Sequence, residues 1–206
     1  MRIEKQRHEV LYPKGTEWQR ETELIELAGR TAYRSEDSIE PGSAQEFIRR
    51  MVKNSHLAVI EFGSMTVRFV TDRGITHELV RHRLCSFIQE STRYCNYGKD
   101  KFERQITVIQ PSGLDDDMKY QIWESAMHTA EQKYLQMLDG GCTPQQARSV
   151  LPTCLKTVIV VKANFREWRH IFELRAINKA AHPDIRALLI PLYNECRGLL
   201  PEVFDI

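Results

Sequence analysis

The segment Leu57–Val70 constrains the fold most, because its second half has the two-residue periodicity of a β-strand. Apolar residues alternate there with polar ones, at positions Met65, Val67 and Phe69. The segment Thr157–Ala163 is rich in β-branched residues and is also strand-like, and Phe102–Gln110 could add another strand. The chain is therefore predicted to contain a β-sheet.

Helices are predicted around these strands from apolar spacing and from capping residues. Their expected ranges are Glu17 to about Tyr33, Ser43–Asn54, Ile75–Arg83, Asp115 to about Leu138, Thr143 to about Pro152, Asn164 onward and His182 onward. We expect Ser43 and Glu46 to form a capping box at the second of these helices. With no repeat, low-complexity tract or linker in the sequence, this mixture of elements predicts a single α+β domain over residues 1–206.

Apolar residues at helical spacing predict the inward face of each helix. These residues are Leu24, Leu27, Ala28 and Thr31; Phe47, Ile48, Met51 and Val52; Ile75, Leu79 and Val80; Trp168, Ile171, Phe172 and Leu174; and Ile185, Leu188, Leu189, Leu192, Cys196 and Leu199.

Composition excludes several classes of protein. The formal net charge of the 206 residues is +1, so no global field would gather nucleic acid or an anionic membrane. The first residues, MRIEKQRHEV, lack the apolar core of a signal peptide, and no apolar run approaches the roughly 18 residues of a membrane span. We therefore expect a cytoplasmic protein.

The five cysteines do not suggest a disulfide framework or a metal site. Their count is odd and their spacing is wide, and the sequence has no CxxC pair and no HExxH. A bound metal is therefore not expected, and most of the thiols should be small buried apolar groups.

The stretch 81–94, RHRLCSFIQESTRY, combines three arginines and a histidine with several short polar side chains. Arginine suits phosphates and carboxylates because it is planar, always charged and bidentate. Neutral donors beside it are typical of a site that holds a phosphate together with a base edge. The alternative is a charged helix end, at which Arg81 and Arg83 complement the helix dipole.

Three further places carry candidate side chains. His56 follows the helix that begins at Ser43, and Arg148 lies near the end of a short helix; both could serve only the helix dipole. On the helix that begins at Asn164, Arg166 and His170 are four residues apart and share a face. Arg175 lies seven residues after Trp168 and extends the apolar stripe of that helix, so its guanidinium is expected either to snorkel to solvent or to be held in a site.

Several common nucleotide and hydrolase motifs are absent from the sequence. It contains no GxGxxG, no GxxxxGK[ST] and no GxSxG. A Rossmann turn, a P-loop and a serine-hydrolase elbow are therefore not expected, and a bound dinucleotide must be held by side chains.

The motif RHR, followed by seven residues and then Ser91, resembles the signature of the flavin-dependent thymidylate synthases. Three further blocks agree with that family in order and approximate spacing: His56 with Glu61, Ala147-Arg148 with Leu151-Pro152, and Asn164-x-Arg166 with His170 and Leu174-Arg175. The resemblance implies a mostly antiparallel central sheet flanked by helices, in a homotetramer whose sites are shared between chains. It also implies FAD-dependent reductive methylation of dUMP to dTMP, with 5,10-methylenetetrahydrofolate as the carbon donor and NADPH as the reductant.

The resemblance also implies roles for individual residues. The FAD contacts would be Ala58, Arg81, His82, Arg83, Gln89, Asn164, Phe165, Arg166 and His170. The dUMP contacts would be Glu78, Leu79, Val80, Arg81, Gln89, Glu90, Ser91, Thr92, Arg93, Arg148 and Arg175. Arg175 would be the catalytic residue, a fixed cation that stabilises negative charge on the uracil. Phe62 and Ile88 depart from the family pattern, and either Lys179 or His182 could approach the flavin.

Two other classes of function compete with this one. A nucleic-acid-binding module could use the arginine motif, with Tyr94 and Tyr97 as stacking platforms; the near-neutral charge disfavours it. A nucleotide hydrolase could use His56 or His82 as a base, but the sequence offers no metal-ligand cluster for it.

Overall fold

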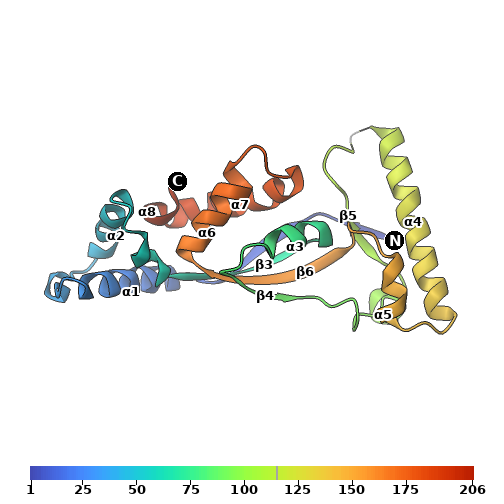
Figure 1. The fold of residues 1–206 in the computed structure, drawn as a ribbon, viewed down its shortest axis with the longest axis horizontal. Helices are drawn as coiled ribbons and strands as arrows, with labels where there is room; N and C mark the ends of the chain where they lie inside the picture. The colour runs from blue at the N-terminus through green and yellow to red at the C-terminus, as the bar shows by residue number, and fades with distance from the viewer. Residues whose placement is uncertain (115) are drawn as a thin grey trace. The chain divides into compact units, whose positions relative to one another are not determined.

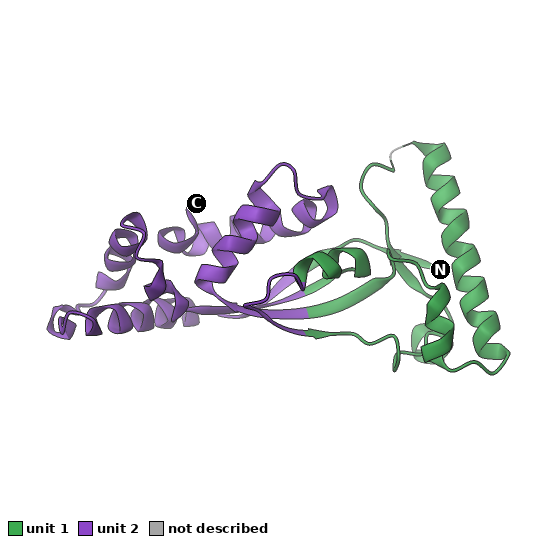
Figure 2. Cartoon of the chain, viewed as in Figure 1, with its two compact units in different colours: residues 1–7, 69–79, 88–159 green, residues 8–68, 80–87, 160–206 purple. Residues whose placement is uncertain are grey.

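The computed structural model describes residues 1–114 and 116–206. Contacts divide the chain into two compact units (Figure 2). Unit 1 consists of residues 1–7, 69–79 and 88–159, and unit 2 of residues 8–68, 80–87 and 160–206. No helix in the described part of the chain is both long enough and apolar enough to cross a membrane.

The strands form two sheets. The larger sheet has the order β2 (Arg7–Tyr12), β3 (Ser64–Asp72), β6 (Lys156–Asn164), β4 (Ser86–Gln89), and neighbouring strands run antiparallel (Figure 1). The smaller sheet pairs β1 (Arg2–Glu4) with β5 (Thr107–Ile109) in parallel. The predicted α+β class and the mostly antiparallel sheet are therefore confirmed.

The predicted strands are confirmed to different extents. Thr157–Ala163 lies wholly within β6, and the alternating half of Leu57–Val70 lies in β3, where Met65, Val67 and Phe69 are all fully buried. The first half of that segment is instead a 3-10 helix, η2 (Leu57–Glu61). Of Phe102–Gln110, only the three residues of β5 are a strand.

Unit 2 contains most of the helices. Besides η2, they are α1 (Glu17–Thr31), η1 (Glu36–Ser38), α2 (Ser43–Lys53), α6 (Phe165–Phe172), the π-helical turn η5 (Glu173–Ile177), α7 (Pro183–Leu199) and α8 (Pro201–Phe204). Their apolar faces form a core in which Phe165 stacks on Trp18 and meets the ring of Phe204 edge to face. The indole N–H of Trp168 donates to the main-chain oxygen of Met65 at 3.0 Å, so α6 is anchored to β3.

The predicted inward face of α1 is wrong. Leu24 and Leu27 are 46% and 48% exposed, whereas Trp18 and Ile25 are buried. The apolar spacing predicted the wrong face because two acidic residues of α1, Glu21 and Glu26, are also buried. Each of them has hydrogen-bond or ion-pair partners inside the protein. Glu21 accepts from Tyr12 and from the main chain of β3, and Glu26 pairs with Arg30 at 2.7 Å.

The predicted capping box at Ser43 is also wrong. The N-cap of α2 is Gly42, whose φ of +85° is in the left-handed region that glycine adopts readily. The hydroxyl of Ser43 donates to the carboxylate of Glu26 on α1 instead of serving the α2 N-terminus. Two expected core leucines are likewise outside the core, since Leu174 is 40% and Leu199 50% exposed.

Unit 1 contains α3 (Arg73–Leu79), η3 (Asp100–Phe102), α4 (Asp117–Asp139), α5 (Pro144–Ala147) and η4 (Arg148–Val150). Its core gathers Tyr97, Ile106, Val108, Tyr134 and Leu155. The cap of α4 is confirmed at Asp116, which accepts from two backbone N–H groups; Asp115 lies outside the described residues. The start of α5 is confirmed too, and Thr143 and Gln146 form a complete capping box there.

Helix α3 ends earlier than predicted. It stops at Leu79, and Val80 is 41% exposed rather than inward. Arg81 and Arg83 therefore lie in the turn after the helix and not on its last turn. The helix-dipole explanation of these arginines is weakened, because the dipole acts mainly within the last turn.

Candidate active site

Unit 2 contains a cavity of about 580 Å³ where α6 begins, within the size range of small-molecule sites. Its basic lining comes from Arg166, Arg169 and His170, and its apolar lining from Leu57 and Leu84. A cavity that combines guanidinium groups, an imidazole and aliphatic side chains can hold a ligand with both anionic and apolar parts.

The start of α6 is positioned by Asn164. This residue ends β6 and N-caps α6, because its side-chain oxygen accepts from the backbone N–H of Glu167 at 2.8 Å. The cap directs Arg166 and His170, one helical turn apart, into the same cavity. The shared face predicted for these two residues is confirmed.

Arg166 closes one edge of the cavity with Glu61 of η2. Its guanidinium lies 2.6 Å from the Glu61 carboxylate, and the two side chains are 51% and 44% exposed. So exposed a pair contributes little to folding. Both members of the pair line the cavity.

The three residues of the RHR motif lie in different environments. Arg81 and Arg83 are exposed, whereas His82 is only 5% exposed. The ring of His82 meets that of His170 edge to face, with centroids 5.8 Å apart. Arg175 donates from its Nε to Nε2 of His82 at 3.3 Å.

Burial, together with the positive charge of Arg175, lowers the pKa of His82 to about 4. The imidazole is therefore neutral at physiological pH. Since Nε2 accepts from Arg175, the ring proton lies on Nδ1, which is 3.5 Å from the carboxylate of Glu167. This contact is one between a neutral imidazole and a carboxylate rather than an ion pair.

Arg175 is carried by the π-helical turn η5. In this turn the backbone N–H of Asn178 bonds to the oxygen of Glu173, five residues earlier, so the chain is wider than an α-helix. Its spacing after Trp168 and Phe172 left open whether the guanidinium would extend to solvent or be held in a site, and the contact with His82 agrees with the second alternative. Ala176 is the buried residue, at 2% exposure, and Arg175 is half-buried against His82.

Unit 1 contains a second cavity, of about 460 Å³, whose polar lining includes Arg73, His77, Thr92, Arg148 and Ser149. The guanidinium of Arg148 donates to the hydroxyl of Thr92 at 3.4 Å. Two arginines and several hydroxyls in one cavity match the donors that proteins use for phosphate.

Two neighbours of this cavity come from the same loop. Arg93 donates from its Nε to the side chain of Gln145 at 2.9 Å, and the hydroxyl of Ser91 accepts from the backbone N–H of Arg93. The sequence stretch that contains Ser91, Thr92 and Arg93 therefore contacts the segment that contains Gln145 and Arg148.

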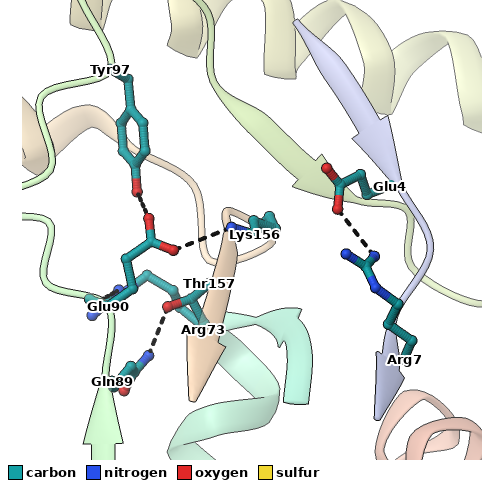
Figure 3. A network of polar contacts seen from close by, with 8 residues as sticks. All are labelled: Glu4, Arg7, Arg73, Gln89, Glu90, Tyr97, Lys156 and Thr157. Carbon is teal, nitrogen blue, oxygen red and sulfur yellow. Dashed lines mark hydrogen bonds and ion pairs between the residues drawn. The ribbon is translucent and has the colours of Figure 1, made fainter. Parts of the chain in front are cut away.

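Glu90 is held in a network inside unit 1 (Figure 3). Its carboxylate accepts from the hydroxyl of Tyr97 at 3.0 Å and pairs with Lys156 at 3.2 Å. Burial, and the charge of Glu90 beside it, raise the pKa of Tyr97, which therefore stays protonated. Arg73 donates to the main-chain oxygen of Glu90, so the network also fixes the cavity's Arg73.

Several residues that were predicted to contact a ligand have side chains that pack in the core or form other hydrogen bonds. Leu79 and Phe165 are core residues at 1% and 0% exposure. The amide of Gln89 donates to the hydroxyls of Thr76 and Thr157 (Figure 3 shows the second bond). A ligand contact from Leu79 or Phe165 therefore has to come from the main chain. Ala58 is exposed in η2, and Glu78 is half-buried in α3.

The remaining residues noted in the sequence lie at the surface. Phe62 and Ile88 are 58% and 78% exposed, so neither departure from the family pattern disturbs the core. Lys179 and His182 are exposed too, and His182 N-caps α7 by accepting from the backbone N–H of Asp184.

Three polar residues of these sites were missed by the sequence analysis. Arg73 and His77 are four residues apart on α3, and that spacing could have paired them. Glu167 could not be recognised as a site residue from the sequence, because an acid in the first turn of a helix such as α6 usually serves the helix dipole.

Comparison with known proteins agrees with the motif. Residues 16–202 match the family model described as "Thymidylate synthase complementing protein". The flavin-dependent thymidylate synthase of Geobacter sulfurreducens is 32% identical over 187 residues, which cover 87% of this chain and 79% of that protein. The enzyme of the same description from Mycobacterium sp. (strain JLS) is 31% identical over 226 residues, covering 96% of this chain and 86% of that protein.

The fold also has a match among solved structures. The UMP/dUMP methylase PolB from Streptomyces cacaoi, bound with 5-Br dUMP, superposes with a TM-score of 0.80 at 23% identity. The match covers all of this chain and 96% of the other. At that identity the likeness establishes the shared fold. The signature motif, the family model and the relatives above 30% identity together show that the chain belongs to the family of flavin-dependent thymidylate synthases.

Proposed function

We propose that the chain converts dUMP to dTMP by FAD-dependent reductive methylation, with 5,10-methylenetetrahydrofolate as carbon donor and NADPH as reductant. The observation that carries the proposal is the unit 2 cavity, whose lining residue His170 meets the ring of His82, which in turn accepts from the half-buried Arg175, in a chain of this family. We further propose that residues 1–206 act as one functional domain, that sites are shared between chains of a homotetramer, and that the protein is cytoplasmic.

The cavity suits a flavin dinucleotide. Arg166 and His170 supply donors for the anionic pyrophosphate, and Leu57 and Leu84 supply apolar surface for the rings. Asn164 fixes the helix start from which Arg166 projects. Bound and reduced, the flavin supplies the hydride that the transferred carbon unit needs to become a methyl group.

The unit 1 cavity suits the phosphate of dUMP. Arg148 and Arg73 offer two permanent cations, and Thr92 and Ser149 offer hydroxyls. A phosphate monoester carries close to two negative charges at neutral pH, so two guanidinium groups match it. Arg148 is already oriented by its bond to Thr92.

Arg175 is proposed to act on the uracil. Carbon 5 becomes nucleophilic when negative charge develops on the ring, and a fixed cation lowers the energy of that state. Arginine does not lose its proton in proteins, so Arg175 stabilises charge and does not act as a base. No cysteine nucleophile is required: burial raises the pKa of the Cys85 thiol to about 12, which keeps it unreactive.

The test is turnover of the purified protein with FAD, dUMP, methylenetetrahydrofolate and NADPH, with dTMP separated and quantified. We expect dTMP only when all four are present, and an oxidised-flavin absorption spectrum that changes when dUMP is added. A protein that retains no flavin and does not respond to saturating dUMP would contradict the proposal. Salt-dependent binding of oligonucleotides would then favour a nucleic-acid-binding module, and phosphate release from dUMP a hydrolase.

A further inference from the structure

Glu167 is a buried carboxylate to which the proposed function gives no task. It is 6% exposed, although it lies in the first turn of α6 and its neighbour Arg166 is exposed. Burial raises the pKa of Glu167, and the nearby His170 opposes that rise. A carboxylate that is taken out of water needs a polar partner to offset the loss of hydration.

That partner is His82. Nδ1 of His82 lies 3.5 Å from the Glu167 carboxylate, and the two side chains are 7% or less exposed. On its other side, Nε2 of His82 accepts from the Nε–H of Arg175 at 3.3 Å. One imidazole therefore joins a carboxylate of α6 to the guanidinium that η5 carries.

The protonation of the imidazole follows from these contacts. An acceptor at Nε2 cannot also carry a proton there, so the single proton of neutral His82 lies on Nδ1, the nitrogen that is 3.5 Å from the Glu167 carboxylate. Among the described residues, Glu167, His170 and Arg175 lie against the ring, and the main-chain N–H of Cys85 donates to the main-chain oxygen of His82. Burial and the two cationic or basic neighbours keep the pKa of His82 low, so this single tautomer persists at neutral pH.

We propose that Glu167 and His82 are positioning residues for Arg175: the carboxylate orients the imidazole, and the imidazole orients the guanidinium. The proposal deepens the proposed function, because it rests on the role of Arg175 toward dUMP. A carboxylate that orients a histidine, which in turn orients a reacting group, is a common arrangement in enzyme sites. Here the group that is oriented is the guanidinium of Arg175.

The competing explanation is that Glu167 only complements the positive end of α6. That explanation requires a negative charge but places no demand on the tautomer of His82. The two explanations therefore differ in what they predict for the histidine ring and for the amide variant Glu167→Gln.

The first experiment observes His82 without any substrate. In protein labelled with ¹⁵N-histidine, the His82 signal is assigned by its absence from His82→Gln. We expect a neutral Nδ1–H tautomer from about pH 6 to pH 8, where an ordinary histidine titrates. In Arg175→Ala we expect the pKa of His82 to rise and both tautomers to be populated. A wild-type His82 with its proton on Nε2, or with two protons at pH 7, overturns the proposal.

The second experiment measures turnover of three variants. Glu167→Ala removes the acceptor, and we expect kcat to fall by about 10- to 100-fold with a much smaller change in KM for dUMP, as expected for a displaced group near the reaction. Glu167→Gln keeps an oxygen that can accept from Nδ1–H, and we expect turnover within about threefold of wild type. Glu46→Gln changes an exposed glutamate of α2 and serves as the matched control.

The outcomes separate this proposal from the proposed function. Equal turnover of Glu167→Ala and Glu46→Gln contradicts the positioning role. Equal loss in Glu167→Ala and Glu167→Gln contradicts it as well, because then the charge matters and not the orientation. If Glu167→Ala does not fold, the turnover of Glu167→Gln and the tautomer of His82 in the wild type still test the positioning role. A wild-type protein that makes no dTMP contradicts the proposed function, while the ring tautomer still shows whether the carboxylate–imidazole–guanidinium chain exists.

Discussion

Arg175 and His82 are 93 residues apart in the sequence, and Nε of the arginine lies 3.3 Å from Nε2 of the histidine. The imidazole accepts this bond in its neutral form, because its pKa is lowered to about 4. The bond from Nε therefore holds one side of the guanidinium through a neutral acceptor.

Arg175→Ala is expected to abolish most turnover while flavin remains bound. The variant removes a cation that acts on charge developing in the reaction, and the loss of one such group commonly costs about 100- to 1,000-fold in kcat. Turnover and the flavin spectrum should be measured together. Arg20→Ala, at an exposed position of α1, is the control and should behave as wild type. Near-normal turnover of Arg175→Ala would remove Arg175 from its proposed role.

Arg148→Ala is expected to weaken dUMP binding by about 10- to 100-fold, since a hydrogen bond between charged groups is worth about 1.5–3 kcal/mol. Isothermal titration with dUMP gives the dissociation constant directly. The matched control is Arg104→Ala, an exposed arginine of the same unit that pairs with Asp139 at 2.9 Å. An unchanged dissociation constant in Arg148→Ala would rule out this contact.

Arg166→Ala is expected to reduce flavin retention and to leave stability almost unchanged. Its partner Glu61 is 44% exposed, and pairs of this kind contribute about 0–1 kcal/mol. The amount of flavin retained after gel filtration tests the expected loss of flavin binding. The unfolding midpoint in urea tests the expected lack of change in stability. Glu61→Gln should keep flavin, because it leaves the guanidinium in place. A large loss of stability in Arg166→Ala would mean that the residue is structural.

Acid is expected to destabilise the protein partly through His82. Its pKa is lowered from about 6.5 in the unfolded chain to about 4 in the folded one. Between these two values the unfolded chain binds a proton that the folded chain does not, so stability falls as the pH falls from about 6.5 towards 4. The difference of pKa corresponds to roughly 3 kcal/mol at most.

The measurement is the free energy of unfolding of wild type and of His82→Gln at a series of pH values. Glutamine cannot take up a proton, so the variant should lose less stability than wild type between about pH 6.5 and pH 4. Parallel curves for the two proteins over this range would mean that His82 titrates normally.

Gly63→Ala is expected to destabilise unit 2. A Cβ at this position would overlap the ring of Phe165 and crowd the side chain of Ile25, both fully buried. Overpacking of this kind usually costs about 1–3 kcal/mol. The control is Gly198→Ala in α7, where a Cβ meets no atom within 4 Å. That variant should gain up to about 1 kcal/mol from helix propensity. Thermal unfolding of the two variants side by side is the test, and a stable Gly63→Ala would show that the Phe165 ring can shift.

Local signals in the sequence predicted the starts of four helices well. Asp116, Thr143, Asn164 and His182 cap their helices where the sequence placed them. Each cap depends on a side chain and on backbone groups two or three residues away, so the necessary information is contained in a few neighbouring residues. The alternation in β3 is equally local, and its buried face is confirmed.

Predictions failed where a distant residue decided the outcome. Ser43 has the sequence context of a capping box, yet its hydroxyl bonds to Glu26 on another helix. Leu24 and Leu27 have core spacing, yet α1 turns Trp18 and Ile25 inward because its buried acids find partners. Periodicity assumes that charges face water, and that assumption fails when a buried carboxylate is paired.

For the candidate sites, the sequence by itself determined the family, the residue types and their order along the chain, because the RHR motif and its companion blocks are linear patterns. Only the tertiary structure decided that His82 is buried and neutral and that the π-helical turn brings Arg175 to one nitrogen of its ring. The tertiary structure also places the carboxylate of Glu167 3.5 Å from the other ring nitrogen. Burial and protonation depend on what packs around a side chain, and these neighbours come from segments far apart in the sequence.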